Sequence, residues 1–171
     1  VGHSSPEFHP LNRGFTSFYG AYNGNVDYFT HMRDGQLDWH EDFSPSRDQG
    51  YATDLFTQRA VAFVEAQDGE EPFFLYLAYT APHTPLQAPP EYLNRYPYLS
   101  GRARTYAAMV SALDDGIGQV LDALDRKGFS DNTLVWFMSD NGATQQDGSK
   151  GPLRDYKGSL FEGGVRVPSV V

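Results

Sequence analysis

The sequence contains no cysteine among its 171 residues. This absence excludes disulfide bonds, thiolate metal sites and a cysteine nucleophile within this chain. Basic residues are also few: 13 Lys and Arg stand against 22 Asp and Glu, which gives a net charge of −9. This balance argues against a nucleic-acid binder, which normally carries a basic footprint. It leaves room for an anionic small substrate, because a site can be locally cationic within an acidic protein.

Long apolar runs are lacking as well. The longest, residues 72–78, has the length of a strand, whereas a transmembrane helix needs ~20 apolar residues, so no membrane span is expected. The first ten residues, VGHSSPEFHP, have neither a basic start nor an apolar core, and no signal peptide is expected there. What is present, 40% hydrophobic and 15% aromatic residues, is typical of one globular domain with its own core.

Two helices are predicted by the spacing of apolar residues. The first begins at Thr53, whose hydroxyl can cap it, and ends at residues 67–69. The second, over residues 102–127, carries one apolar stripe, and Gly128 is well placed as its C′ residue. Within it, the Asp-Asp-Gly triplet at 114–116 is interpreted as a solvated face with a tolerated glycine rather than as a metal site.

The order of the elements predicts the fold class. Residues 1–50 show little periodicity and predict loops with short strands. Continuous apolar runs at 72–79 and 133–139 predict strands covered on both faces, and residues 165–171 begin a third strand. Helices that alternate with strands predict an α/β fold with a mostly parallel sheet flanked by helices.

Polar side chains follow the two predicted strands. His83 comes after the first strand, and Asp140 and Asn141 come after the second. Ligands bind beyond the carboxyl ends of parallel strands, and a right-handed crossover places such strands near one another, so we expect these groups to converge. The oxygens of Asp140 and Asn141 suit a hard cation such as Ca²⁺. Asp-Asn-Gly also favours a simple turn, and spacing alone leaves both interpretations open.

Two further groups are candidates for chemistry. Prolines stiffen the backbone around His83, whose imidazole can act as a general acid or an anion contact, or can belong to a plain surface loop. Lys157, in RDYKGSLFEGGVRVP (154–168), can neutralise a multiply charged oxyanion together with a metal, or can lie in a flexible basic loop. HEDF at 40–43 can chelate a metal on paper, but nothing else in the sequence supports that role.

Taken together, the motifs resemble a known family. The stretches FFLYLAYTAPHTPLQAPPEY, DNTLVWFMSDNGA and KGSLFEGGVRVP, in this order and at these distances, are similar to the type I sulfatases of the alkaline phosphatase superfamily. RGFTSFYGAYNGNVDYFTH and YATDLFTQRAVAFV resemble the arylsulfatase B-like branch. The resemblance implies an alkaline phosphatase-like α/β fold. It also implies hydrolysis of sulfate esters with a bound Ca²⁺ and a formylglycine made from Cys or Ser.

The resemblance assigns roles to particular residues. Asp140 and Asn141 match the metal-binding pair of the family's S-D-N-G motif. His83 matches the histidine of the H-x-P loop, which contacts the sulfate and the leaving group, and Lys157 matches a sulfate-binding lysine. Residues 162–164 match a Glu-Gly-Gly segment that shapes the lysine loop. The implied substrate is a sulfated small molecule or glycan, with an N-acetylgalactosamine sulfate as one candidate, and the implied location is secreted, periplasmic or lysosomal.

The sequence also departs from the family pattern. The formylglycine motif C/S-x-P-S-R is absent: FSPSR (43–47) has Phe43 where the Cys or Ser should be, and it lies too late in the chain. The early pair of metal-binding aspartates is missing, and the "VG" at residues 1–2 resembles the tail of a K-W-H-x-G motif. Residues 1–171 therefore resemble the central portion of a sulfatase catalytic domain, without the nucleophile-bearing part and the C-terminal subdomain.

Two other functions stay open at this point. One is a phosphoesterase or phosphonate hydrolase of the same superfamily, and the other is a degenerate module that only binds sulfated glycans. For the chain by itself we expect no sulfatase activity and weak Ca²⁺ binding, since two ligand residues supply too few of the six to eight oxygens that Ca²⁺ takes.

Overall fold

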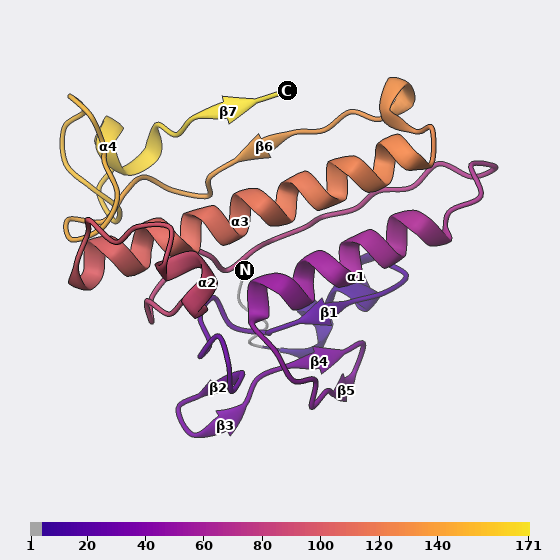
Figure 1. Cartoon of the computed structure of the whole chain (residues 1–171). Coiled ribbons are helices and arrows are strands. Elements are labelled where there is room, and N and C mark those ends of the chain that lie inside the picture. The colour runs from indigo at the N-terminus through magenta and orange to yellow at the C-terminus, as the bar shows by residue number, and fades with distance from the viewer. Residues whose placement is uncertain (1–4) are drawn as a thin grey trace. The chain divides into compact units, whose positions relative to one another are not determined.

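The computed structural model describes residues 5–171, so the "VG" at residues 1–2 lies outside the described part. The chain divides into two compact units, which separate in sequence between Gly128 and Phe129. Figure 1 shows the course of the chain through both units. We refer to residues 5–128 as the first unit and to residues 129–171 as the second unit.

The first unit opens with short elements, as the sequence predicts for this region. Two single-turn 3₁₀ helices are followed by two-residue strands that pair in antiparallel fashion: β1 with β4, β4 with β5, and β2 with β3. The FSPSR stretch supplies strand β5 of this small sheet. The bounds are η1 (Pro6–Phe8), η2 (Pro10–Arg13), β1 (Tyr19–Gly20), β2 (Met32–Arg33), β3 (Gln36–Leu37), β4 (His40–Glu41) and β5 (Ser44–Pro45).

Both predicted helices are present. Helix α1 (Ala52–Ala66) begins one residue before Thr53, so the expected cap is wrong: Tyr51 is the N-cap residue, and Thr53 is buried inside the first turn. Helix α3 (Gly101–Arg126) has almost the expected bounds, and the short α2 (Pro90–Leu93) precedes it. Gly128 takes a left-handed conformation after α3, as predicted, and its N–H donates to the carbonyl of Asp125. No helix within residues 5–171 is long and apolar enough to cross a membrane.

Helices α1 and α3 pack side by side (Figure 1), and Gly116 of α3 lies at their contact. A Cβ at this position would lie 2.4 Å from Oγ1 of Thr57 and 3.0 Å from the hydroxyl oxygen of Tyr79. The interpretation of Gly116 as a tolerated glycine is therefore wrong, because the packing requires the absence of a side chain there. The neighbouring Asp115 is on the surface as expected, paired with Arg95 at 2.7 Å.

Residues 72–79 are extended but form no ladder with another described strand. Alternate side chains turn inward, and Tyr79 shares a 2.8 Å hydrogen bond with Thr57 of α1. The side chains between them face out, since Phe74 is 74% exposed and Tyr76 is 65% exposed. The expectation of a strand covered on both faces is therefore wrong for this chain, in which the helices cover one face.

The second unit contains η3 (Ser130–Asn132), β6 (Phe137–Met138), α4 (Glu162–Val165) and β7 (Ser169–Val170). Strand β6 pairs with β7 in antiparallel register, Phe137 opposite Val170. All strand pairs formed by residues 5–171 are antiparallel, so the described residues do not form the mostly parallel sheet that the element order predicts. Parallel strands need partners delivered by crossover connections, and neither predicted buried strand finds such a partner here.

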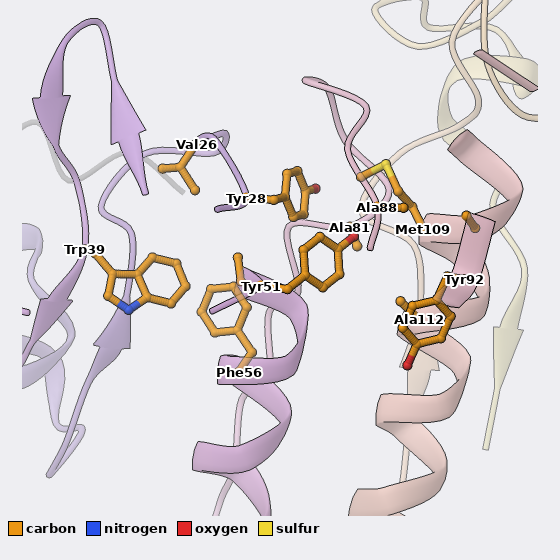
Figure 2. Packing of buried hydrophobic residues seen from close by; sticks show 12 residues of the cluster. Val26, Tyr28, Trp39, Tyr51, Phe56, Ala81, Ala88, Tyr92, Met109 and Ala112 are labelled. Atoms are coloured by element: carbon orange, nitrogen blue, oxygen red, sulfur yellow. The ribbon is translucent and has the colours of Figure 1, made fainter. Parts of the chain in front are cut away.

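The core of the first unit is largely aromatic. Tyr28 and Trp39 are fully buried, and Tyr28 stacks on Tyr51 with ring centroids 5.5 Å apart (Figure 2). Helix α3 contributes small residues to the same buried cluster, among them Ala108 and Ala112. The buried cluster comprises Val26, Tyr28, Trp39, Tyr51, Ala52, Phe56, Ala81, Ala88, Tyr92, Ala108, Met109 and Ala112. This core ties the N-terminal strands to the loop that carries His83.

Candidate functional site

The chain bends directly after β6 and leaves Asp140 accessible. Ser139 donates its hydroxyl hydrogen to the carbonyl of Asn141 at 2.8 Å, which closes the turn. Asp140 is exposed and Asn141 is half-buried. The turn and the ligand interpretation are therefore compatible, because the turn presents a carboxylate and a carboxamide at one strand end.

The glycine that follows this turn lies against the glycine pair of α4. The N–H of Gly142 donates to the carbonyl of Gly164 at 3.0 Å, and the N–H of Gly163 donates to the carbonyl of Arg154 at 2.7 Å. A Cβ on Gly142 would lie 1.9 Å from the carbonyl oxygen of Gly163, a distance that no side chain tolerates. The two segments therefore meet backbone against backbone, which only glycine permits.

A neighbouring hydrogen bond fixes the backbone of Lys157. Its N–H donates to the carbonyl of Ala143 at 2.8 Å, so the lysine loop is bonded to the residue that follows Gly142. Lys157 is exposed and borders an open hollow of about 390 Å³, which Thr144 and Tyr156 also line. Within the second unit, the structure thus brings the lysine loop to the strand end that carries Asp140 and Asn141.

His83 lies in the first unit, on a loop with a well-defined backbone. Its N–H donates to the carbonyl of Thr80 at 2.9 Å, and its carbonyl accepts the hydroxyl hydrogen of Tyr28 at 3.1 Å. The ring is exposed, and Nδ1 lies 2.8 Å from the carbonyl oxygen of Thr84. Since a carbonyl oxygen only accepts, Nδ1 carries the hydrogen, and Nε2 is the ring atom left for a substrate.

His83 and the Asp140–Asn141 pair belong to different units, so their expected convergence stays a prediction. Within residues 5–171 no group of three or more His, Asp or Glu side chains is arranged to hold a metal ion. Any cation held by Asp140 and Asn141 would need oxygen ligands from elsewhere.

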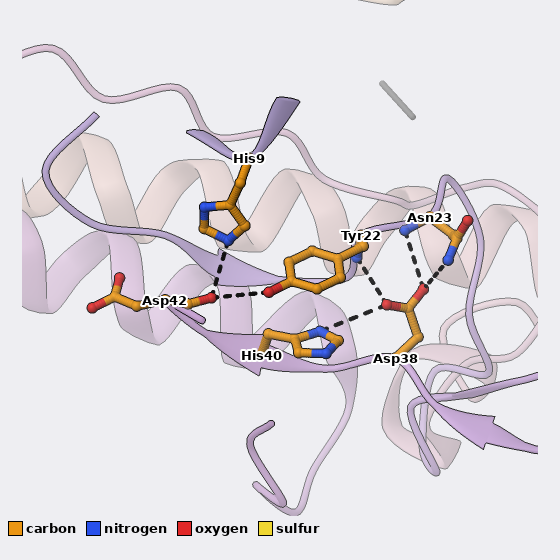
Figure 3. Close-up of polar contacts among 6 residues, drawn as sticks. All are labelled: His9, Tyr22, Asn23, Asp38, His40 and Asp42. Atoms are coloured by element: carbon orange, nitrogen blue, oxygen red, sulfur yellow. Dashed lines mark hydrogen bonds and ion pairs between the residues drawn. The ribbon is translucent and has the colours of Figure 1, made fainter. Parts of the chain in front are cut away.

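Residues of the HEDF stretch take part in the packing of the N-terminal strands (Figure 3). His40 stacks on Tyr22 with ring centroids 3.8 Å apart, and its Nδ1 lies 3.7 Å from a carboxylate oxygen of Asp38. Burial lowers the pKa of His40 below its usual value. The backbone carbonyl of Asp42 accepts hydrogen bonds from His9 and from the hydroxyl of Tyr22.

Sequence reasoning missed the residues that anchor the His83 loop. Gln87 and Asp27 form a 2.6 Å hydrogen bond across 60 positions of sequence. No local pattern marks such a pair, because periodicity reports which face of an element is buried and not which distant residue it meets. The nearby prolines indicated a stiff loop, but not what holds it.

Known proteins match this chain along nearly its whole length. The Sulfatase family model matches residues 3–171. The chain belongs to the sulfatase family. Arylsulfatase J of Mus musculus is 39% identical over 95% of the chain, and N-acetylgalactosamine-6-sulfatase of Mus musculus is 36% identical over 99%. The chain spans 29% and 35% of the lengths of these two sulfatases.

A solved structure shows the same fold. The crystal structure of Ps i-CgsB in complex with k-i-k-neocarrahexaose is 38% identical and superposes with a TM-score of 0.88. The match covers 96% of this chain and 41% of that chain. The sulfatase family membership inferred from the ordered motifs is thereby confirmed.

Proposed function

We propose that the protein containing this sequence is a sulfuric ester hydrolase that cleaves sulfate esters of a sulfated sugar. Family membership supports the reaction class. Similarity to N-acetylgalactosamine-6-sulfatase and to a protein crystallised in complex with k-i-k-neocarrahexaose supports a sugar substrate. The observation that carries the proposal is the glycine contact that holds the lysine loop against the Asp140–Asn141 turn. Asp140, Asn141 and Lys157 all belong to the second unit, which supports a common role for a carboxylate, a carboxamide and an ammonium group.

We further propose that residues 1–171 are the central portion of a longer catalytic domain. The share of the sulfatase relatives that this chain spans, 29% and 35%, supports this proposal. The nucleophile, the remaining metal ligands and the C-terminal subdomain would then lie outside this sequence. A secreted, periplasmic or lysosomal location, as the resemblance implies, stays a prediction.

The residues at the end of β6 fit a Ca²⁺ ion in part. A carboxylate and a carboxamide are the hard oxygen donors that Ca²⁺ prefers, and Asp140 is accessible to it. When bound, Ca²⁺ would polarise the sulfate, and the formylglycine would supply the nucleophile. Asp140 and Asn141 would supply only part of the Ca²⁺ coordination, and other segments of the complete protein would supply the rest.

Two side chains of this chain would act on the substrate directly. The ammonium of Lys157 would offset the charge of the sulfate, an effect that strengthens where water is excluded. His83, with Nδ1–H held by the carbonyl of Thr84, would present Nε2 toward the ester. In its protonated form, Nε2–H would give its proton to the departing alcohol oxygen.

The Asp140→Ala substitution in the complete enzyme tests the metal assignment. Loss of one electrostatic group at a reacting centre lowers kcat on the order of 10²–10³-fold, and we expect a loss of this size with 4-nitrophenyl sulfate. Asp131→Ala is the matched control, since Asp131 is an exposed acidic residue of the same unit that lies outside the turn. Near-normal turnover by the Asp140→Ala enzyme at limiting Ca²⁺ would rule out the assignment.

A further inference from the structure

The loop that carries His83 is anchored by a side chain that uses both ends of its carboxamide. Nε2 of Gln87 donates to Oδ2 of Asp27 at 2.6 Å, and Oε1 of Gln87 accepts the N–H of Tyr28 at 2.8 Å. The other carboxylate oxygen of Asp27 accepts the N–H groups of Phe29 and Thr30, at 3.0 and 2.7 Å. Donors and acceptors are matched throughout, so the orientation of the Gln87 carboxamide is fixed by its partners.

Two buried tyrosines bond to the same loop from the core. The hydroxyl of Tyr28 donates to the carbonyl of His83 at 3.1 Å, and the hydroxyl of Tyr51 donates to the carbonyl of Gln87 at 2.9 Å. Tyr28 is 0% exposed and Tyr51 is 4% exposed, and Figure 2 shows both rings within the apolar cluster. Hydrogen bonds at buried positions are costly to leave unmade, so they hold the loop backbone firmly.

Asp27 imposes the orientation of this network because it is ionised. Partial burial raises the pKa of its carboxyl group, but the hydrogen bonds from Gln87 and from the backbone of Thr30 and Phe29 outweigh this effect and bring the pKa to about 2. At working pH the carboxylate is therefore an acceptor only. Gln87 must turn its NH₂ toward Asp27 and its oxygen toward Tyr28.

We propose that Asp27, Gln87 and Tyr28 are positioning residues of the sulfatase, which hold the backbone of His83 so that its imidazole meets the ester in one orientation. The proposal rests on the role of His83 in the proposed function. The physical reason is that a ring on an exposed loop keeps a reactive geometry only if its own backbone is fixed, and a displacement of about 1 Å can cost ~10²-fold in rate.

A donor–acceptor exchange in the complete enzyme tests the network. In Asp27→Asn the new carboxamide still accepts from the backbone N–H groups of Phe29 and Thr30, but its NH₂ then faces the NH₂ of Gln87. In the double variant D27N/Q87E the new carboxylate at position 87 accepts from both the carboxamide at 27 and the N–H of Tyr28. We expect Asp27→Asn to lower kcat for 4-nitrophenyl sulfate by roughly 10–100-fold with little change in KM, and D27N/Q87E to recover most of it.

A second set of variants tests whether Asp27→Asn lowers kcat through its effect on His83. In a His83→Ala background, where there is no imidazole to position, Asp27→Asn should add less than twofold to the loss in kcat. If Asp27 had only a structural role, Asp27→Asn would lower the kcat of the His83→Ala enzyme by the same factor as it lowers the kcat of the unmodified enzyme. Tyr28→Phe removes only one hydroxyl group and gives the same test if Asp27→Asn lowers the yield of folded enzyme, which thermal unfolding would show.

The outcomes separate the two proposals. If His83→Ala keeps near-normal kcat, the role of His83 in the proposed function fails, and the positioning role fails with it. If His83→Ala is impaired while Asp27→Asn and Tyr28→Phe are not, only the positioning role is overturned. Losses that multiply with His83→Ala, or a double variant D27N/Q87E no better than Asp27→Asn, also overturn it.

Discussion

Single glycines decide the geometry of the candidate sulfate site. Gly142 and Gly163 are in contact through their backbones, and neither has a conformation that itself demands glycine. Their requirement is spatial: a Cβ on Gly142 would lie 1.9 Å from the carbonyl oxygen of Gly163, and a Cβ on Gly163 would lie 1.9 Å from the carbonyl oxygen of Asp155. According to the family resemblance, the Glu-Gly-Gly segment shapes the lysine loop. In this structure the segment contacts Gly142 directly.

At Gly142 we expect alanine to separate the turn from the lysine loop. The added Cβ would have to move more than an ångström from the carbonyl of Gly163, and such overpacking costs about 1–3 kcal/mol. We predict a lower thermal midpoint and a loss of turnover in the complete enzyme. Gly24→Ala is the control, because a Cβ there meets nothing within 4 Å. Equal activity of both variants would show that the loops tolerate a side chain.

At the scale of elements, the crossing of α1 and α3 organises the first unit. It depends on Gly116, which admits the hydroxyl groups of Thr57 and Tyr79 against the backbone of α3. Tyr79 in turn ends the extended segment that leads to the His83 loop. A substitution at this contact would therefore also disturb Tyr79, which lies directly before the His83 loop.

Two glycines two positions apart in α3 should respond in opposite ways to alanine. Gly116→Ala would place a Cβ 2.4 Å from Oγ1 of Thr57, and we expect a loss of about 1–3 kcal/mol in the free energy of unfolding. Gly118→Ala meets nothing within 4 Å and should raise it by up to about 1 kcal/mol, the difference in helix propensity. Urea unfolding measures both. Parallel effects of the two substitutions would contradict the packing role of Gly116.

Over the whole molecule, a buried histidine makes stability depend on pH. His31 is 2% exposed, stacks on Trp39 and lies 3.1 Å from the carbonyl of Gly50 through Nε2. Burial lowers its pKa, so the folded state favours the neutral ring. The neutral ring of His31 therefore contributes fully to stability when the pH is above about 6.5, the pKa of histidine in the unfolded chain. This contribution is lost as the pH falls through the lower pKa of the folded state.

We thus expect the free energy of unfolding to decrease as the pH falls below about 6.5. His31→Gln should reduce this slope, because it removes the group that protonates. Carboxylates with a lowered pKa, such as Asp27, add a separate decrease only below about pH 4, so the two effects are resolved by pH. Urea unfolding between pH 7.5 and 5 measures the slope. A slope that is unchanged in His31→Gln would refute this assignment.

Apolar side chains remain on the surface of both units. Phe74 and Tyr76 in the first unit and Leu134 and Trp136 in the second are each more than half exposed. Exposed apolar patches and unpaired extended segments favour association. We expect the purified 171-residue chain to bind a hydrophobic dye, to bind Ca²⁺ weakly and to show no sulfatase activity. Turnover of 4-nitrophenyl sulfate by this chain would contradict the prediction, with the complete enzyme as the positive control.

The sequence by itself determined what depends on neighbouring positions. The apolar stripe that buries α3 and the left-handed Gly128 at its end were predictable, because helical spacing and a C′ glycine are local properties. The ordered motifs around His83, Asp140 and Lys157 were enough to identify the sulfatase family. The motifs do not establish that these residues form one site, because His83 and Asp140 belong to different units.

The tertiary structure alone decided which distant residues meet. The fit of Gly142 against Gly163, the need for Gly116, and the bond from Gln87 to Asp27 all join positions far apart in the chain. The same reason explains the errors in strand pairing and burial. Other segments supply the partners of a strand and cover its second face. An apolar run therefore predicts that a strand is buried, but it does not show which segment buries it.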